Sequence, residues 1–211
     1  MRRVHAAFLA LAALASVAPH PARGSGPSAG DDAAMLSTLP ARLAGLRRQG
    51  PPGPAPGPEG GAVLAFARQN VTAAVTLSGR TALPVPDGPT SASARGALAE
   101  ATGDASLRML EEATRRARAG SGRRPTELRW RSFVVHDGSS TDLLCNRAAL
   151  PASRGLVTEV VCVSGVAGRM MTVGITITHD RRGGEEAIRL ACRFAAAARA
   201  ALRDAIRLER A

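Results

Sequence analysis

Two histidine–aspartate pairs, at positions 136–137 and 179–180, are the residues of this chain best suited to acid–base chemistry. Ser139 and Ser140 follow the first pair, and a serine beside a histidine is the basic arrangement of a serine-type hydrolase. His136 with Ser139 or Ser140 is therefore one candidate site. In a simple antiparallel meander, the two strands that carry these pairs run in opposite directions. Their C-terminal ends therefore lie at opposite ends of the sheet, more than about 20 Å apart. We expect the pairs to stay separate, because Asp-Gly and Ser-Ser are also ordinary turn sequences.

The chain has three cysteines, Cys145, Cys162 and Cys192, whose spacing matches neither a Cys-x-x-Cys motif nor a zinc site. In an oxidising compartment two of the three are expected to pair. If the turn between the first two is centred on residues 153 and 154, Cys145 lies opposite Cys162, and we predict this disulfide. A pair that includes Cys192 is the alternative. The remaining thiol is either a half-buried bystander or a reactive cysteine whose pKa is lowered by arginine.

Five arginines on one side of the last predicted helix form a candidate binding surface: Arg189, Arg193, Arg199, Arg203 and Arg207. Guanidinium forks suit phosphate and carboxylate groups, so we predict that this surface binds an anionic or protein partner. All 28 basic residues of the chain are arginine, which, with the abundant alanine, glycine and proline, indicates a GC-rich coding bias. The net charge of +11 is therefore weak support for a polyanionic partner, and a solvated arginine surface is the alternative.

The sequence lacks the common cofactor and nucleic-acid motifs. No glycine-rich phosphate loop is present, and no G-x-G-x-x-G segment opens a helix after a strand. The acidic residues form no convincing catalytic pair, and the aromatic content is only 2%, too low to supply the side chains that stack on RNA bases. We predict no cofactor, no metal site and no nucleic-acid partner, and we favour a binding protein over an enzyme.

The sequence patterns that predict the helices and strands carrying these residues are clearest near the C-terminus. Apolar and small polar residues alternate over 171–178, and a Val- and Thr-rich segment over 156–164 precedes them. This pattern predicts a hairpin whose two-residue turn is Val166-Ala167. The periodicity then changes to about 3.6 over residues 185–210, which predicts a long amphipathic helix with its apolar face toward the hairpin.

The remaining pattern predicts the rest of the domain. Strand-like segments occupy 62–78, 127–136 and 141–147, a helical pattern occupies 107–119, and a weaker one occupies 91–101. We therefore predict an α+β fold: an antiparallel meander of about five or six strands packs on the long C-terminal helix, and one further helix precedes the meander. With one Trp, four Phe and no Tyr, the core must be aliphatic.

The N-terminal part indicates export. Two arginines precede an apolar run over residues 6–18 that contains an Ala-x-Ala cleavage sequence. The run is too short to span a bilayer, which takes about 20 residues, so no transmembrane segment is expected after signal removal. We predict a signal peptide over 1–15, a disordered Pro- and Gly-rich leader or linker over 16–61, and one α+β domain over 62–211.

Four leucines inside the predicted leader, Leu36, Leu39, Leu43 and Leu46, recur at spacings of three and four. This is the pattern of a short basic amphipathic helix over 35–48 that docks on a membrane or a partner. The interpretation we favour is a partly ordered arm that rests on the chain's own domain.

The sequence as a whole predicts an exported, non-enzymatic accessory or binding protein of the cell envelope, periplasmic or secreted. It would engage a protein or an anionic envelope component through the arginine surface. The alternatives are an exported hydrolase that uses His136 with Ser139 or Ser140, and a carrier of a small ligand with a pocket between a helix and the sheet.

Overall fold

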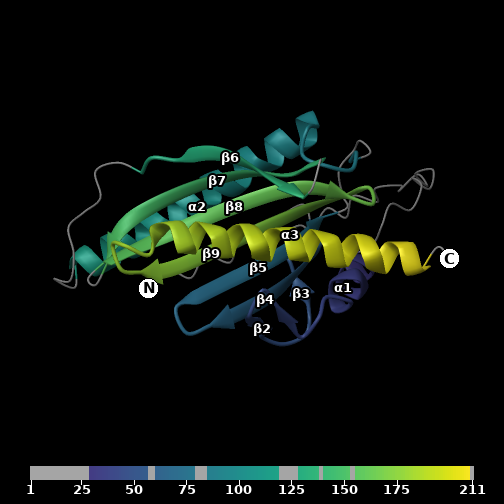
Figure 1. Ribbon diagram of the computed structural model, residues 1–211, viewed down its shortest axis with the longest axis horizontal. Helices are drawn as coiled ribbons and strands as arrows, with labels where there is room; N and C mark the ends of the chain where they lie inside the picture. The colour runs from purple at the N-terminus through teal and green to yellow at the C-terminus, as the bar shows by residue number, and fades with distance from the viewer. Residues whose placement is uncertain are drawn as a thin grey trace, which may run out of the picture.

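The structure is a computed structural model that describes residues 29–56, 60–78, 85–118, 128–137, 140–152 and 155–209; the predicted signal peptide over 1–15 lies outside them. It is an α+β fold in which an antiparallel sheet carries one long helix on each face (Figure 1). The helices are α1 (Ala29–Ser37), α2 (Ala92–Arg118) and α3 (Gly184–Glu209). The strands are β1 (Arg42–Leu43), β2 (Leu46–Arg48), β3 (Gly53–Pro54), β4 (Ala62–Arg68), β5 (Val71–Ser78), β6 (Arg131–Asp137), β7 (Ser140–Ala152), β8 (Gly155–Val166) and β9 (Arg169–His179).

The sheet confirms the predicted meander and extends it. In the described residues the strand order is β1-β2-β4-β5-β9-β8-β7-β6, and β3 pairs with β4. Strands β6 to β9 form the four-strand meander, and the hairpin β4–β5 joins it because β5 pairs with β9. The sheet is wider than five or six strands, since the segment before β4 contributes three short strands.

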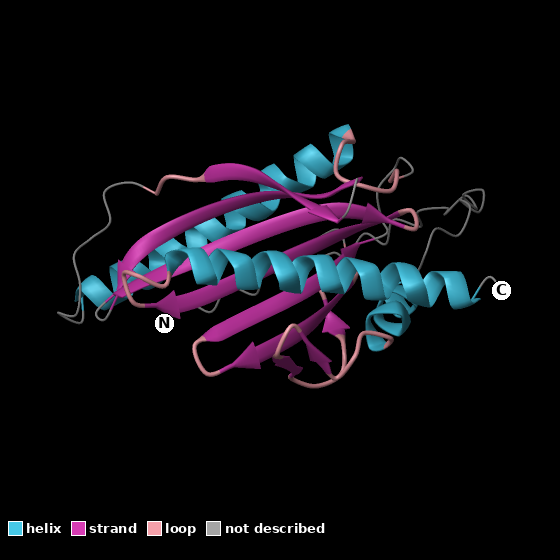
Figure 2. Cartoon of the chain, in the orientation of Figure 1, coloured by secondary structure: helices cyan, strands magenta, loops and turns pink. Residues whose placement is uncertain are grey.

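The main apolar core lies between the sheet and α3, as the alternating pattern predicts. Ile175 on β9 and Phe194 on α3 are both fully buried in this core. The rings of Phe194 and Phe66 meet edge to face, with centroids 5.3 Å apart and planes at 73°. Figure 2 shows α3 crossing one face of the sheet while α2 lies behind the other face.

The turn between β8 and β9 differs from the prediction by one position. Val166 pairs with Arg169, so the turn is Ala167-Gly168, whose φ angles are +51° and +76°. A two-residue turn of this type requires positive φ at both positions, which glycine adopts freely and a β-branched residue such as Val166 resists. The correction moves every pairing by two residues, so each side chain stays on its predicted face.

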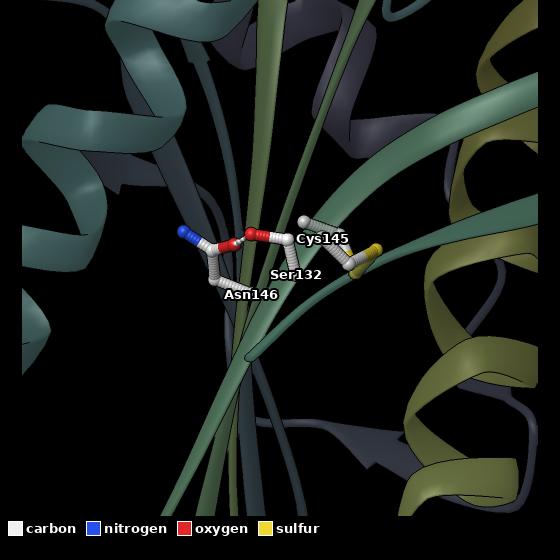
Figure 3. Close-up of a disulfide and its surroundings, with 4 residues drawn as sticks. Ser132, Cys145 and Asn146 are labelled. Atoms are coloured by element: carbon white, nitrogen blue, oxygen red, sulfur yellow. Dashed lines mark hydrogen bonds between the residues drawn. A yellow bond between two sulfur atoms is a disulfide. The ribbon is translucent and has the colours of Figure 1, made fainter. Parts of the chain in front are cut away.

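The predicted disulfide is confirmed. Cys145 on β7 pairs directly with Cys162 on β8, and their sulfur atoms are bonded. Both residues are fully buried on the α3 side of the sheet. The next residue, Asn146, points the other way: its amide accepts a hydrogen bond from Ser132 (Figure 3) and donates one of 3.0 Å to Thr102 of α2. Asn146 thus ties β7 to α2, while the disulfide at Cys145 joins β7 to β8.

Helix α2 is one continuous element, where the sequence pattern indicates two separate helical segments. Ser91 caps it, because the Ser91 hydroxyl accepts a hydrogen bond of 3.0 Å from the amide of Ala94. Gly103 lies in mid-helix, which costs about 1 kcal/mol relative to alanine but does not end the helix. On its inner side α2 packs Leu98 and Met109 against β7, β8 and β9.

The prediction of a disordered leader over 16–61 is wrong for residues 29–56, and so is a single helix over 35–48. Leu36 lies in α1 and Leu46 in β2, and both are fully buried in the main core. The buried carboxylate of Asp32 accepts a hydrogen bond of 2.7 Å from Arg169 and so fixes α1 to the start of β9. Proline and glycine interrupt regular helices and strands in this segment. Its leucines are nevertheless buried, because removing their apolar surface from water stabilises the fold.

Candidate functional site: a cleft between α2 and the sheet

The face of the sheet opposite α3 is only partly covered by α2. The helix packs mainly on β7 and β8, so within the described residues the part of this face formed by β9, β5 and β4 is left open beside it. A cleft of about 1010 Å³ lies between this open floor and one edge of α2. We call it the α2 cleft. Its volume is at the upper end of the range typical of small-molecule sites, about 300–1000 Å³.

The floor of the α2 cleft is made of unusually small side chains. Strand register places three rows side by side across β4, β5, β9 and β8: Val63, Thr76, Thr172 and Val163; then Ala65, Ala74, Gly174 and Val161; then Ala67, Thr72, Thr176 and Glu159. A Cβ atom added at Gly174 would meet no atom of the described residues within 4 Å, so the middle of the floor is a trough. Threonine hydroxyls stand on either side of this trough.

The wall of the cleft is one ridge of α2, on which lining residues recur every fourth position. Gly96, Glu100, Asp104 and Arg108 form this ridge. Residues four apart lie one above another on a helix, so the ridge runs along the whole length of the cleft. Its small residues lie toward the N-terminal end of α2, and its charged residues lie toward the C-terminal end.

One buried carboxylate, that of Glu159 on β8, closes the charged end of the floor. The residue is 5% exposed. Its carboxylate accepts a hydrogen bond of 2.5 Å from the Thr176 hydroxyl, and an Arg108 nitrogen lies 3.8 Å away. Burial raises the pKa of the Glu159 carboxyl above its ordinary value, and these two partners oppose the shift only in part. A carboxyl with a perturbed pKa in a cleft is typical of a functional site.

The structure separates the five predicted binding arginines. Arg189, Arg193, Arg203 and Arg207 lie on the outer side of α3, exposed or half-buried. The prediction that Arg199 belongs to the binding surface is wrong. Arg199 is 6% exposed and forms a buried ion pair with Asp142. Its Nε donates a hydrogen bond of 3.0 Å to the Ser164 hydroxyl. Its position borders the apolar side of the helix, and the acidic partner on β7 stabilises its charge there.

The histidine candidates do not come together. Strands β6 and β9 run in opposite directions and are separated by β7 and β8, so His136 and His179 lie near opposite ends of the sheet. His179 is held by the Thr158 hydroxyl, 2.7 Å from its Nε2. Ser139 lies outside the described residues, and only the backbone of Ser140 is described.

Cys192, the third cysteine, lies on α3 and is free and half-buried. Burial raises the pKa of its thiol, and a backbone hydrogen bond and the charge of Arg147 oppose this shift only in part. A raised pKa keeps the thiol protonated and so reduces its nucleophilic fraction. The geometry therefore favours the bystander interpretation over a reactive cysteine.

Sequence reasoning named a helix–sheet pocket as an alternative but assigned no residue to it. Two signals for it are present in the sequence. Glu159 is a charge inside a strand that is otherwise rich in valine, and Glu100, Asp104 and Arg108 recur at spacings of four. The second signal becomes visible only when α2 is treated as one helix, because a break near residue 103 places these residues on unrelated elements.

Among the described residues, no three or more His, Cys, Asp or Glu side chains are grouped so that they could hold a metal ion. In the same part of the chain, no helix is long and apolar enough to cross a lipid bilayer. Comparisons of the chain with protein families, with curated proteins and with solved structures found no match.

Proposed function

We propose that this protein is an exported, non-enzymatic binding protein and that its ligand is a small organic molecule held in the α2 cleft. The observation that carries the proposal is the open floor of alanine, glycine and threonine beneath a long helix. Where a helix packs tightly on a sheet, larger side chains fill the interface, because close packing is what stabilises an interior. Export is supported by the Cys145–Cys162 disulfide, which fits an oxidising compartment, and by the signal-like N-terminal sequence.

The cleft is tested by filling it. Gly174→Leu places a large side chain in the trough, and its backbone is not in the left-handed region, so we expect no strain. Gly103→Leu is the matched control, because Gly103 is exposed on α2 away from the cleft and also has open space around it. The probe is N-phenyl-1-naphthylamine, a neutral dye whose fluorescence rises in apolar surroundings.

We expect saturable dye binding to the wild type and to Gly103→Leu, and a loss of at least about tenfold in affinity for Gly174→Leu, since the side chain occupies the volume the dye requires. Circular dichroism should show that both variants fold. Equal dye affinity in all three proteins, or no binding to any of them, would rule out the cleft as the binding site. Export is tested by fractionating cells that express the full chain and determining the N-terminus of the mature protein.

A second candidate function is binding of an anionic partner through the outer side of α3. Four arginines favour it, because at 100° per residue Arg189, Arg193, Arg203 and Arg207 fall within about 80° of one another. The test is retention on an anionic resin as salt is raised. Arg193→Gln with Arg207→Gln should elute earlier than a double variant of equal charge on β2 and β6, Arg47→Gln with Arg131→Gln. If the two double variants elute at the same salt concentration, retention depends on net charge alone, and the candidate anion-binding function of α3 is wrong.

A further inference from the structure

We propose that the ligand of the α2 cleft is an organic cation: an amine or amidine on a slim, largely apolar body, with its charged group beside Glu159. This inference rests on the proposed function, since it names the class of molecule that the same cleft takes. It follows from how charge, size and polarity are distributed along the cleft.

The cleft has two chemically different ends. The N-terminal part of α2 packs near Met170, and its lining residues there are Ser93, Gly96 and Ala97. Fifteen residues further along the helix, which is about 22 Å at 1.5 Å per residue, Arg108 reaches Glu159. The cleft is therefore long, neutral at one end and charged at the other.

The charge of the cleft opposes that of the protein. Three carboxylates, Glu100, Asp104 and Glu159, line it together with one guanidinium, Arg108. The chain as a whole carries a net charge of +11. Clefts lined by one sign of charge concentrate ligands of the opposite sign, because low-dielectric walls focus the field. An anionic ligand would instead meet carboxylates on the wall and at the end of the floor.

The carboxylate of Glu159 is the group that the cationic ligand would bind. A carboxylate has about four sites for accepting hydrogen bonds, and the Thr176 hydroxyl uses one of them; the Arg108 nitrogen, 3.8 Å away, is an ion-pair partner and not a hydrogen-bond donor. The Arg108 side chain is 64% exposed, so its charge is shared with water and compensates the buried carboxylate weakly. A ligand ammonium in the cleft brings a full positive charge and its own hydrogen-bond donors to the same carboxylate.

The middle of the cleft limits the shape of the uncharged part of the ligand. Ala74 and Gly174 form the floor there, and Ala101 lines the helix side. These side chains offer apolar contact and little bulk, which suits a flat ring or an unbranched chain. Four threonines flank the trough, at positions 72, 76, 172 and 176, and their hydroxyls provide hydrogen bonds to a ligand.

The test is a set of three probes that share one body and differ only in the head group: 4-phenylbutylamine, 4-phenylbutanol and 4-phenylbutyrate. Binding to the folded chain is followed by shifts of backbone amide signals in β5 and β9, with probe concentrations up to tens of millimolar. We expect the amine to bind at least about tenfold more tightly than the alcohol, since the ammonium brings a full positive charge to the buried carboxylate, whereas the hydroxyl brings only a hydrogen bond. The carboxylate should bind more weakly than the alcohol.

Two variants assign the preference to Glu159. Glu159→Gln should reduce amine affinity by at least about tenfold, which removes the preference for the amine over the alcohol. Glu111→Gln, an exposed acid of α2 outside the cleft, should change neither. If the three probes bind equally, or if Glu159→Gln keeps the amine preference, the cation inference is wrong while the cleft remains a binding site. If no probe shifts the β5 and β9 signals, and Gly174→Leu has no effect on dye binding, both proposals fail.

Discussion

Removing the charge of Arg199 provides the strictest test of how α3 sits on the sheet. Its guanidinium is paired with Asp142 inside the protein, and the two side chains are 7% and 2% exposed. In Arg199→Met the aliphatic volume is kept, but the carboxylate of Asp142 stays buried without its cation. Breaking a buried pair in this way costs about 3–5 kcal/mol, a large part of the roughly 5–15 kcal/mol by which a domain is stable.

Replacing both charges together separates this penalty from lost packing. In Arg199→Met with Asp142→Leu no buried charge is left alone, so we expect stability to return to within about 1–2 kcal/mol of the wild type. The control is Arg193→Met, an exposed arginine of the same helix, with an expected change of no more than about 0.5 kcal/mol.

The free energy of unfolding is measured for each protein by urea denaturation followed by circular dichroism. The reasoning is refuted if Arg199→Met and Arg193→Met have the same stability, because Arg199 would then lie in water. It is also refuted if the double variant is as unstable as the single one, since the penalty would then come from lost contacts and not from an unpaired charge.

Three further outcomes follow from the structure. Burial raises the folded pKa of Glu159, so its contribution to stability is present at low pH and lost as pH rises through that pKa; urea unfolding should show Glu159→Gln gaining stability relative to the wild type as pH rises above the ordinary carboxyl pKa of about 4. Removing the disulfide by Cys145→Ala with Cys162→Ala should lower the free energy of unfolding by about 3 kcal/mol, given a sequence separation of 17. Leu46→Ala should cost about 2–5 kcal/mol and Leu208→Ala, which is 78% exposed, no more than about 0.5; equal small effects would show that the N-terminal segment is not part of the core.

The C-terminal half of the fold was predictable because its signals are local. Alternation over β9 and the 3.6-residue period of α3 each indicate an element and its buried side. The Cys145–Cys162 disulfide also followed from counting back from a turn at residues 153 and 154. The turn at Ala167-Gly168 was missed by one residue, and the error did no harm because a shift of two in register preserves the faces.

The N-terminal half and the cleft were not predictable in the same way, because they depend on contacts between distant segments. Leu36 and Leu46 resemble a short amphipathic helix in sequence, and only the sheet decides that they enter the core from a helix and a strand. Arg199 looks like a surface residue until Asp142 is placed beneath it. The cleft needs α2 over the sheet face that carries Gly174 and β5 beside Gly174 in the sheet, and neither neighbour is near it in sequence.

The pairing of β5 with β9 has a consequence for how the molecule matures. Val71 on β5 lies beside Ile177 on β9, so the middle of the sheet is closed by segments from opposite ends of the chain. Such long-range pairing forms slowly, because the entropy of the long intervening loop is lost before the stabilising contacts between the strands form. The N-terminal hairpin has no central neighbour until almost all of the polypeptide has been synthesised. Under the proposed export, this topology would slow folding and so favour passage of the unfolded chain across the membrane.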